Sequence, residues 1–346
     1  MNKIFKVIWS KSKQCYVVVS EMAKNKTGKK KIVVASILAA LAMQTASVID
    51  VAAAVGDQPS AAIANGSVTS GKTNGLAIGN FASSGSNQSI AIGYYSVATA
   101  TEADPALPAT AVGAGANATG QSTVALGLLA QATSGSTTAL GAKSVASEDA
   151  AVAVGYGTKA TGNYASALGA DATASNNDAT AFGHGTVASG GSSTALGSRA
   201  KAGGTAGVGI GMLANATNQY GVAIGGESSS SADNSIAIGR KSSVTGESGI
   251  AIGAFTTSKG ANGVAVGTNG TKSDLGGVAV GQAAQSIAFN SVATGMNVTA
   301  KGANSVALGA SATANDDGTI AIGSYGSTPT KATGNRALAI GSATTA

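Results

Sequence analysis

The tetrad x-Ala-aliphatic-Gly recurs along most of the chain, and its spacing constrains the fold more than any other feature of the sequence. Its glycine falls at positions 79, 93, 113, 127, 141, 155, 169, 183, 197, 211, 225, 239, 253, 267, 281, 295, 309, 323 and 341. Of these 18 intervals, 16 are 14 residues long, and the other two are 20 and 18 residues long. A fixed period of this kind indicates a solenoid built from one repeated coil.

Large and small side chains alternate before each repeat glycine. The preceding residue is Ile, Val, Leu or Phe in 18 of 19 units, and the residue before that is Ala in 18 of 19, with Thr294 and Gly209 as the exceptions. A period of two is typical of a strand. Small residues three and five positions after the glycine, as in Ala130 and Ala132, predict a second strand, and a turn former such as Gly162 often follows. We therefore predict an all-β parallel solenoid of 14-residue coils.

The positions of the prolines support this reading independently. None lies between Gly113 and Gly323, where the repeat is regular, whereas Pro105 and Pro108 fall in the first longer interval and Pro329 in the second. Proline has no N–H to donate to a ladder between coils, so it is confined to places where the chain leaves the ladder. The two longer intervals are therefore predicted to be insertions into an otherwise continuous array.

The alternation also divides each unit into a face of large residues and a face of alanine. We expect the large residues to form the core, namely Ile78, Ile92, Ile238, Ile252, Leu308 and Ile322. About two aliphatic side chains per coil offset little of the backbone entropy lost on ordering that coil. We therefore expect a homo-oligomer in which the alanine face, including Ala237, Ala251 and Ala307, packs closely against another solenoid.

The positive charge of the chain is concentrated at its N-terminus. The whole sequence has a formal net charge of +6, but residues 1–54 alone carry +7, so the remainder carries −1. Lysines precede the twelve-residue apolar segment 32–43, which is too short to span a bilayer as a resident helix. This order is typical of a secretory signal, with cleavage after Ala54 or near Ser47. An N-terminal anchor helix is the alternative.

Two groups of residues resemble known families. The segment that includes Met1–Ser10 and Tyr16–Glu21 resembles the extended signal-peptide region of large autotransported proteins. The units Asn234–Gly239 (NSIAIG) and Asn304–Gly309 (NSVALG) resemble the N-S-V-A-I-G signature of YadA-like heads of trimeric autotransporter adhesins. The second resemblance covers about residues 76–346 and implies a trimer of left-handed parallel β-rolls.

The resemblance also implies a function and a location. Family heads bind host extracellular matrix or host cells and mediate bacterial self-aggregation, after export through the Sec route. Family members continue into a stalk and a β-barrel anchor, whereas this sequence ends at Ala346. We therefore expect a cell-surface, outer-membrane or secreted protein that is a truncated product, a fragment, or a head anchored by another component. Its parts are the extended signal peptide 1–54, a lead-in segment 55–75 and the head repeats 76–346.

Several motifs resemble binding or catalytic sites, and each has a simpler structural explanation. Gly66–Thr73 matches the phosphate-loop pattern, but a repeat strand follows it where that motif requires a helix. His184 is the single histidine and is interpreted as an exposed turn residue. The adjacent acids Glu148-Asp149 and Asp316-Asp317 are interpreted as solvated turn residues. One histidine and one cysteine cannot form a zinc site or a disulfide framework, and we expect no metal and no cofactor.

The sequence favours a non-enzymatic adhesin head that acts through many weak contacts along a rod. The near-neutral charge after residue 54 and the isolated tyrosines argue against nucleic-acid binding. The insertions offer candidate ligand-contact residues, namely Glu102, Asp104, Leu107, Tyr325 and Lys331. The alternative is a structural or biofilm scaffold without a host ligand. A solenoid enzyme acting on polysaccharide would require a recurring charged cluster, which the sequence does not show.

Overall fold

The computed structural model divides the chain into two units, Met1–Val48 and Ile49–Ala346. It describes residues 5–10, 15–20, 61–63, 67–68, 74–100, 107–323 and 328–346. In the first unit, β1 (Phe5–Ser10) and β2 (Cys15–Ser20) form an antiparallel pair. The apolar segment 32–43 and the predicted cleavage site lie outside the described residues. The described residues include no helix long and apolar enough to cross a membrane.

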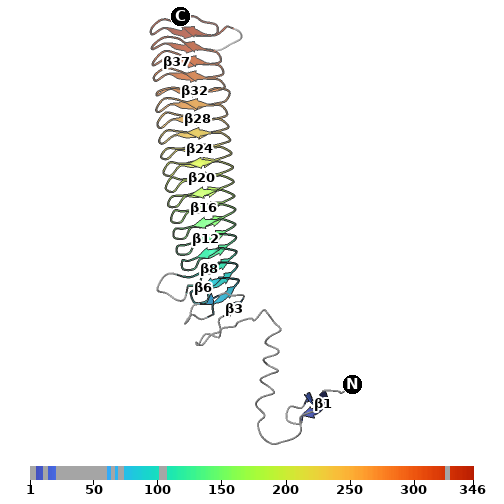
Figure 1. Ribbon diagram of the computed structural model, residues 1–346. Coiled ribbons are helices and arrows are strands. Elements are labelled where there is room, and N and C mark those ends of the chain that lie inside the picture. The colour runs from blue at the N-terminus through green and yellow to red at the C-terminus, as the bar shows by residue number, and fades with distance from the viewer. Residues whose placement is uncertain are drawn as a thin grey trace. The chain divides into compact units, whose positions relative to one another are not determined.

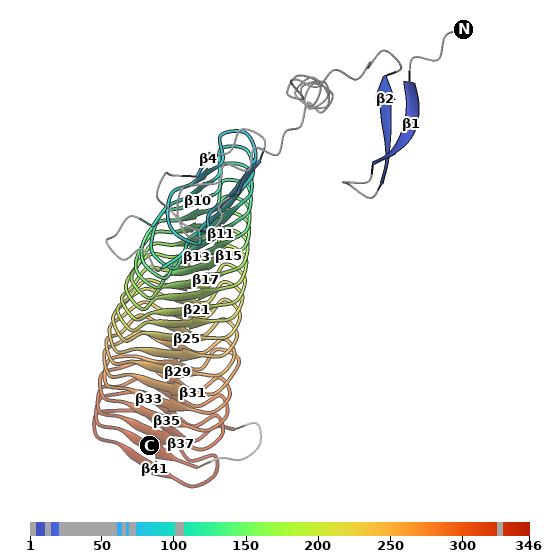
Figure 2. The same ribbon diagram turned by 90° about the horizontal axis from the view of Figure 1, so that it is seen from below.

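The second unit is a parallel β-solenoid whose coils stack one on the next (Figures 1 and 2). Each coil gives one strand to each of two parallel sheets. The first sheet contains β3 (Ala61–Ile63), β5 (Leu76–Ile78), β7 (Ile90–Ile92), β9 (Thr110–Val112), β11 (Val124–Leu126), β13 (Thr138–Leu140), β15 (Val152–Val154), β17 (Ser166–Leu168), β19 (Thr180–Phe182), β21 (Thr194–Leu196), β23 (Val208–Ile210), β25 (Val222–Ile224), β27 (Ile236–Ile238), β29 (Ile250–Ile252), β31 (Val264–Val266), β33 (Val278–Val280), β35 (Val292–Thr294), β37 (Val306–Leu308), β39 (Ile320–Ile322) and β41 (Leu338–Ile340).

The second sheet consists of shorter strands that follow those of the first sheet. It contains β4 (Ser67–Val68), β6 (Ser83–Ser84), β8 (Val97–Ala98), β10 (Asn117–Ala118), β12 (Gln131–Ala132), β14 (Val145–Ala146), β16 (Lys159–Ala160), β18 (Thr173–Ala174), β20 (Val187–Ala188), β22 (Lys201–Ala202), β24 (Asn215–Ala216), β26 (Ser229–Ser230), β28 (Ser243–Val244), β30 (Thr257–Ser258), β32 (Lys272–Ser273), β34 (Gln285–Ser286), β36 (Thr299–Ala300), β38 (Thr313–Ala314) and β40 (Lys331–Ala332). In each coil, the first turn leads from the first sheet to the second, and the second turn leads back to the first sheet.

The pairing register confirms the predicted coil length. Ile238 pairs with Ile224 on one side and Ile252 on the other, each 14 residues away. The insertions leave this register intact, because Ile92 pairs with Val112 across the first of them. Equivalent residues of successive coils therefore stack in columns along the solenoid. The left-handed sense of the coils stays a prediction.

The predicted orientation of the two faces is wrong, and the structure reverses it. Ala237, Ala251 and Ala307 are fully buried inside the single chain, so they do not form an oligomer contact. The predicted core residues point outward instead. Ile252 and Ile322 are 39% and 36% exposed, and the others, Ile78, Ile92, Ile238 and Leu308, are half-buried.

The distance between the two sheets explains this reversal. Among the described residues, the largest fully buried side chains are Val244 and Val298, followed by threonines. Opposite Val244 the chain has Gly249, where an added Cβ would lie 2.7 Å from a Val244 methyl carbon. In another coil the same two positions are Ser230 and Ser235, whose hydroxyl oxygens are 2.6 Å apart. The interior therefore accepts Ala, Ser, Thr and an occasional Val, but no column of Ile or Leu.

Buried hydroxyl groups close both turns of the coil. After the repeat glycine, the Ser242 hydroxyl donates to the carbonyl oxygen of Gly239 at 2.9 Å. In the second turn, the Ser235 hydroxyl donates to the carbonyl oxygen of Ala232 at 2.6 Å. The Ser235 hydroxyl thus gives the Ala232 carbonyl a partner, and the Ser242 hydroxyl adds a second donor to the Gly239 carbonyl, which also accepts from the Ser242 N–H at 3.2 Å. Small polar residues are thus as much a part of the interior as alanine.

The N-S-I-A-I-G unit can now be explained residue by residue. Asn234 has φ of 55°, a left-handed conformation that asparagine tolerates better than most residues. Ser235 and Ala237 are buried, whereas Ile236 and Ile238 point outward. Gly239 has φ of 127°, and a Cβ on it would lie 2.5 Å from the carbonyl oxygen of Gly253 in the next coil. The motif therefore encodes one turn, one strand and the close stacking of coils.

Candidate interaction surfaces

The outward side of the first sheet is mainly apolar along its described length, and its polar positions are Thr110, Thr138, Ser166, Thr180, Thr194 and Thr294. We call it the aliphatic face, and it consists of the first and third residues of each strand from β5 to β41. None of these residues is charged. The apolar residues among them that are more than a third exposed are Val124, Leu126, Leu140, Val152, Leu168, Phe182, Leu196, Ile252, Val280, Ile320, Ile322, Leu338 and Ile340. A mainly apolar surface of this length marks an interaction site.

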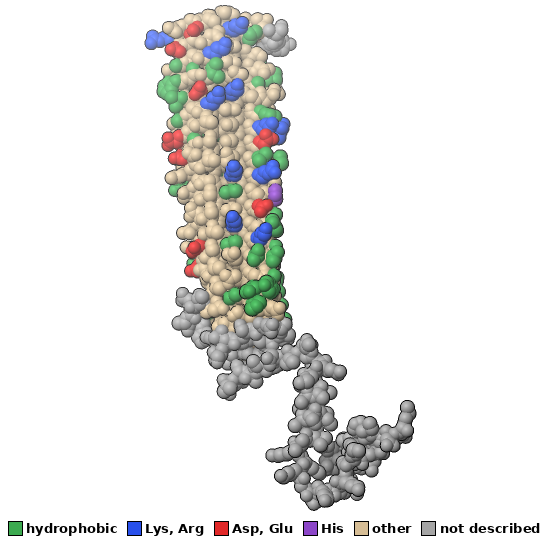
Figure 3. All heavy atoms as spheres, in the orientation of Figure 1, with side chains coloured by type: hydrophobic (Ala, Val, Ile, Leu, Met, Phe, Trp, Pro, Cys, Tyr) green, Lys and Arg blue, Asp and Glu red, His purple; other side chains and the backbone are tan. Residues whose placement is uncertain are grey.

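The outward side of the second sheet is mainly polar. We define the second-sheet face as the first residue of each strand from β6 to β40 together with the residue directly after each strand. Lys159, Lys201, Lys272 and Lys331 share one register column of this face. Ser, Thr, Asn, Gln and Val occupy the remaining positions of the column. Figure 3 shows blue side chains along the middle of a face whose red side chains lie mostly near its edges.

The first turns near the start of the solenoid carry an exposed aromatic cluster. The Phe81 and Tyr95 rings stack with centroids 4.7 Å apart, and Tyr94 meets Tyr95 edge to face at 4.4 Å. All three side chains are more than half exposed. Reduced hydration of its hydroxyl, with smaller effects from the charge and hydrogen bond of Tyr95, raises the pKa of Tyr94 above 10.0. The cluster is therefore an exposed aromatic patch near the start of the solenoid.

Charged residues in later first turns make weak local contacts. Lys241 Nζ lies 3.5 Å from Glu227 Oε2, and both side chains are exposed. The Arg240 guanidinium lies 4.4 Å from the centre of the Phe255 ring. His184 is an exposed first-turn residue, as predicted. Exposed pairs of this kind contribute little to stability, about 0–1 kcal/mol each.

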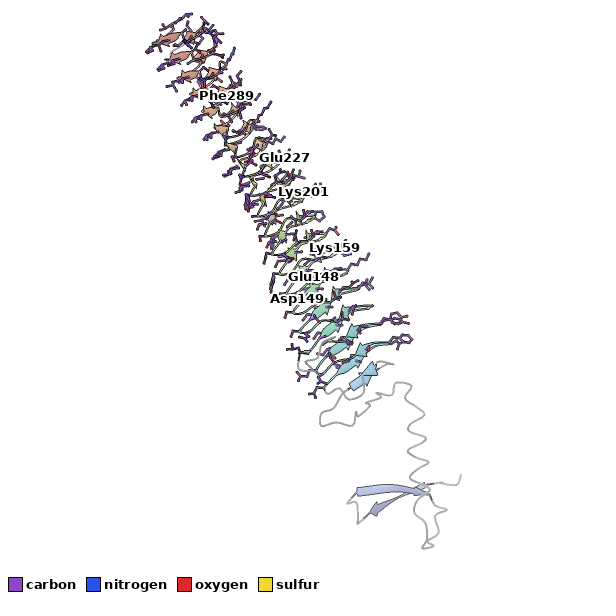
Figure 4. All side chains as sticks on the ribbon, turned by 90° about the vertical axis from the view of Figure 1, so that its left-hand side faces the viewer. Glu148, Asp149, Lys159, Lys201, Glu227 and Phe289 are labelled. Atoms are coloured by element: carbon purple, nitrogen blue, oxygen red, sulfur yellow. The ribbon has the colours of Figure 1, made fainter. Side chains whose placement is uncertain are left out.

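Acidic and amide side chains of the second turns have a structural role that the motifs in the sequence did not suggest. Asp149 Oδ1 accepts a hydrogen bond of 3.1 Å from the Gly135 N–H, one coil earlier. Asn163 Oδ1 accepts from the Asp149 N–H at 3.2 Å, and Asp317 Oδ1 from the Ala303 N–H at 2.8 Å. The signal was present in the sequence, because Asp149, Asn163 and Asn177 are 14 residues apart. Asp149 and Glu148 project from the coils in Figure 4.

Only two of the five residues predicted to contact a ligand lie in the part of the chain that the structure describes. Glu102, Asp104 and Tyr325 lie outside the described residues. Leu107 is half-buried ahead of β9. Lys331 does not belong to a loop, because it is the exposed outward residue of β40 on the second-sheet face.

The structure gives no support to a phosphate-binding loop or to a metal site among the described residues. Ser67–Val68, inside the apparent phosphate-loop pattern, is strand β4 and pairs in parallel with β6. No group of three or more His, Cys, Asp and Glu residues that could hold a metal ion occurs in the part of the chain that the structure describes. What the described residues present is a set of long, repetitive surfaces.

A repetitive parallel solenoid behind an export signal defines a class of surface-exposed bacterial proteins, and family comparisons identify which one. Residues 1–48 match the Extended Signal Peptide of Type V secretion system. The YadA head domain repeat matches residues 70–101, 108–130, 132–158, 160–186, 188–213, 216–242, 245–269 and 300–325. These head-repeat matches cover more than half of the chain, so the chain belongs to the YadA head family of trimeric autotransporter adhesins. No curated protein matches the chain.

Membership of this family confirms the resemblance seen in the sequence, and it indicates how the protein is exported and what type of protein it is. The signal match indicates Sec export, and the family is exported to the cell surface. The fold and family are those of a structural adhesin. The 14-residue β-solenoid was therefore predicted correctly from the period of the sequence.

Proposed function

We propose that this chain is an adhesin head that assembles as a trimer of left-handed solenoids through the aliphatic face. The observation that carries the proposal is the mainly apolar, charge-free surface of the first sheet, which extends from β5 to β41. The interior of the single coil buries mainly alanine, serine and threonine, which supply little hydrophobic stabilisation. Covering Ile238, Ile252 and their equivalents would supply the missing burial, and the family supplies the number three.

Burial of the aliphatic face leaves the second-sheet face and the turn edges as the repeated outer surface of the rod. We propose that this surface binds host extracellular-matrix proteins or cell-surface ligands and supports self-aggregation between bacteria. Each coil contributes a weak contact, and the repetition of coils, chains and surface copies converts weak contacts into avidity. No catalytic step is part of the proposal.

Sedimentation and cross-linking of the exported, signal-processed protein test the assembly. We expect the wild-type protein to be a trimer and the Ile238→Asp variant to dissociate, because a carboxylate would be buried without a partner. Thr257→Asp, on the second-sheet face, is the matched control and should remain trimeric. A folded wild-type monomer, or equal dissociation of both variants, would refute the assembly.

Adhesion is tested with bacteria that display the full protein. We expect them to bind surfaces coated with collagen, fibronectin or laminin more strongly than bacteria without the gene. Self-aggregation without binding to any of these surfaces would instead support the scaffold function that the sequence left open.

A further inference from the structure

The second-sheet face carries six exposed lysines, and four of them lie close together toward its C-terminal end. Lys272 and Lys331 are outward residues of β32 and β40, and Lys259 and Lys301 directly follow β30 and β36. Five coil steps separate the coil of Lys259 from that of Lys331. At about 4.7–4.9 Å per step, the four ammonium groups are distributed over about 24 Å. The other two, Lys159 and Lys201, continue the face toward the N-terminus (Figure 4).

These lysines are not neutralised within the chain. The single ion pair among the described residues joins Lys241 and Glu227, which lie in first turns and not on this face. The one carboxylate on the second-sheet face is Asp274, and its Oδ1 accepts a hydrogen bond of 2.9 Å from the Leu275 N–H. The C-terminal part of the face is therefore a strip of net positive charge, and most of the residues between its charges are polar.

We propose that this lysine strip, formed by Lys259, Lys272, Lys301 and Lys331, binds a linear anionic polysaccharide that carries sulfate or uronate groups. The strip is straight because equivalent residues stack along the solenoid, so an extended chain of several sugar units can follow it. Most outward residues between the lysines are polar, namely Thr257, Gln285, Thr299, Thr313, Asn315 and Thr333, and Ile287 is an exposed apolar residue among them. Their hydroxyl and amide groups can exchange hydrogen bonds with sugar hydroxyls.

The same features disfavour the other anionic partners. Duplex DNA carries one negative charge for about every 1.7 Å of its axis, whereas the strip offers four positive charges in about 24 Å. No aromatic side chain lies on the second-sheet face between β6 and β40 on which a base could stack. The acidic turns of a second copy are also poor partners, because Asp317 and Asp316 already accept backbone hydrogen bonds.

The inference rests on the proposed adhesin function in one respect, since the second-sheet face must stay uncovered in the trimer. The test measures binding of a size-defined heparin oligosaccharide to the exported, signal-processed protein by calorimetry. Neutral dextran and duplex DNA of similar length are compared with it. We expect heparin to bind and dextran not to bind, with heparin affinity falling as salt is raised from about 0.05 to about 0.2 M.

Two charge-matched variants locate the site. Replacing Lys259, Lys272, Lys301 and Lys331 by glutamine should weaken heparin binding about tenfold or more, and replacing all four by arginine should preserve it. The control replaces four first-turn cations by glutamine, namely Lys143, Arg199, Arg240 and Lys241. This control has the same net charge as the first variant and should change the affinity by less than about twofold.

Several outcomes overturn the inference. They are absence of heparin binding to the wild-type protein, equal weakening by both glutamine variants, tighter binding of DNA than of heparin, and salt-sensitive self-association that only the lysine-strip variant abolishes. Circular dichroism and sedimentation establish that each variant is folded and trimeric, and the arginine variant decides the outcome should the glutamine variant not fold. A trimer that mediates adhesion but does not bind heparin refutes this inference alone, whereas a monomer refutes the proposed assembly.

Discussion

Replacing Gly239 by alanine tests whether close stacking of the repeat glycines determines how near successive coils can lie. The backbone at Gly239 has φ of 127°, which costs an alanine about 1–3 kcal/mol. The added Cβ would also lie 2.5 Å from the carbonyl oxygen and 2.6 Å from the carbonyl carbon of Gly253. Both are backbone atoms of the next coil, so relief of the overlap requires that coil to move, at a further cost of about 1–3 kcal/mol.

Gly270 provides the matched control for this substitution. It also has a positive φ, 89°, but an added Cβ would meet no atom within 4 Å. Gly270→Ala therefore carries the conformational cost without the overlap, about 1–3 kcal/mol in total. The difference between the two variants measures the contribution of coil stacking alone, about 1–3 kcal/mol.

The measurement is urea denaturation monitored by far-UV circular dichroism. Repeat proteins depart from two-state unfolding, so the shift of the midpoint is compared rather than an extrapolated free energy. We expect Gly239→Ala to lower the midpoint clearly more than Gly270→Ala does, at equal protein concentration and in the same oligomeric state. An equal or larger shift for Gly270→Ala would show that backbone conformation, and not crowding between coils, explains the repeat glycine.

Two further predictions concern the interior and the second turns. Gly249→Ser should destabilise the protein by about 1–3 kcal/mol, because Val244 fills the space opposite Gly249. The double variant Gly249→Ser with Val244→Ser should recover most of the lost thermal stability, since a pair of serines fills these two positions in other coils. Asp233→Ala should cost about 0.5–1.5 kcal/mol, because Asp233 accepts the Gln219 N–H at 3.1 Å. Glu247→Ala, in the equivalent turn of the next coil, should be close to neutral in the same melts; a loss as large as that of Asp233→Ala would contradict the hydrogen-bond explanation.

The period of the sequence was sufficient to predict the coil, because a strand and its turns depend on residues that are close in the chain. Strand positions, parallel stacking and the place of the insertions all follow from where the repeat glycines fall. The orientation of the first strand was predicted wrongly, because alternation shows which residues share a face and not which face closes on the other sheet. That closure depends on the distance between two sheets, which a large-to-small pattern in one strand does not contain.

The second strand did contain the missing information. Its inward candidates are small in nearly every unit, with Val244 as an exception, whereas its alternate positions include Lys159 and Lys201, which cannot be buried in an apolar interior without a partner. An interior bounded on one side by alanine and serine in successive coils is narrow. The first strand must then also present its alanines, such as Ala237, and turn its isoleucines outward. Comparing the two strands of a coil, rather than reading one, would have given the observed arrangement.

The outward isoleucines connect the stability of the coil to the assembly of the head. In the single chain, hydrogen bonds between coils and buried hydroxyls hold together an interior of small side chains, and each such bond contributes about 1 kcal/mol net. The large apolar groups of the first sheet lie on the aliphatic face, where the proposed trimer would cover them with another copy. In the proposed trimer, burial of the aliphatic face therefore stabilises both the fold and the association. The apparent stability of the protein then depends on its concentration. A head of this design is stable as an assembly, and its polar outer surface is left free to vary with the ligand.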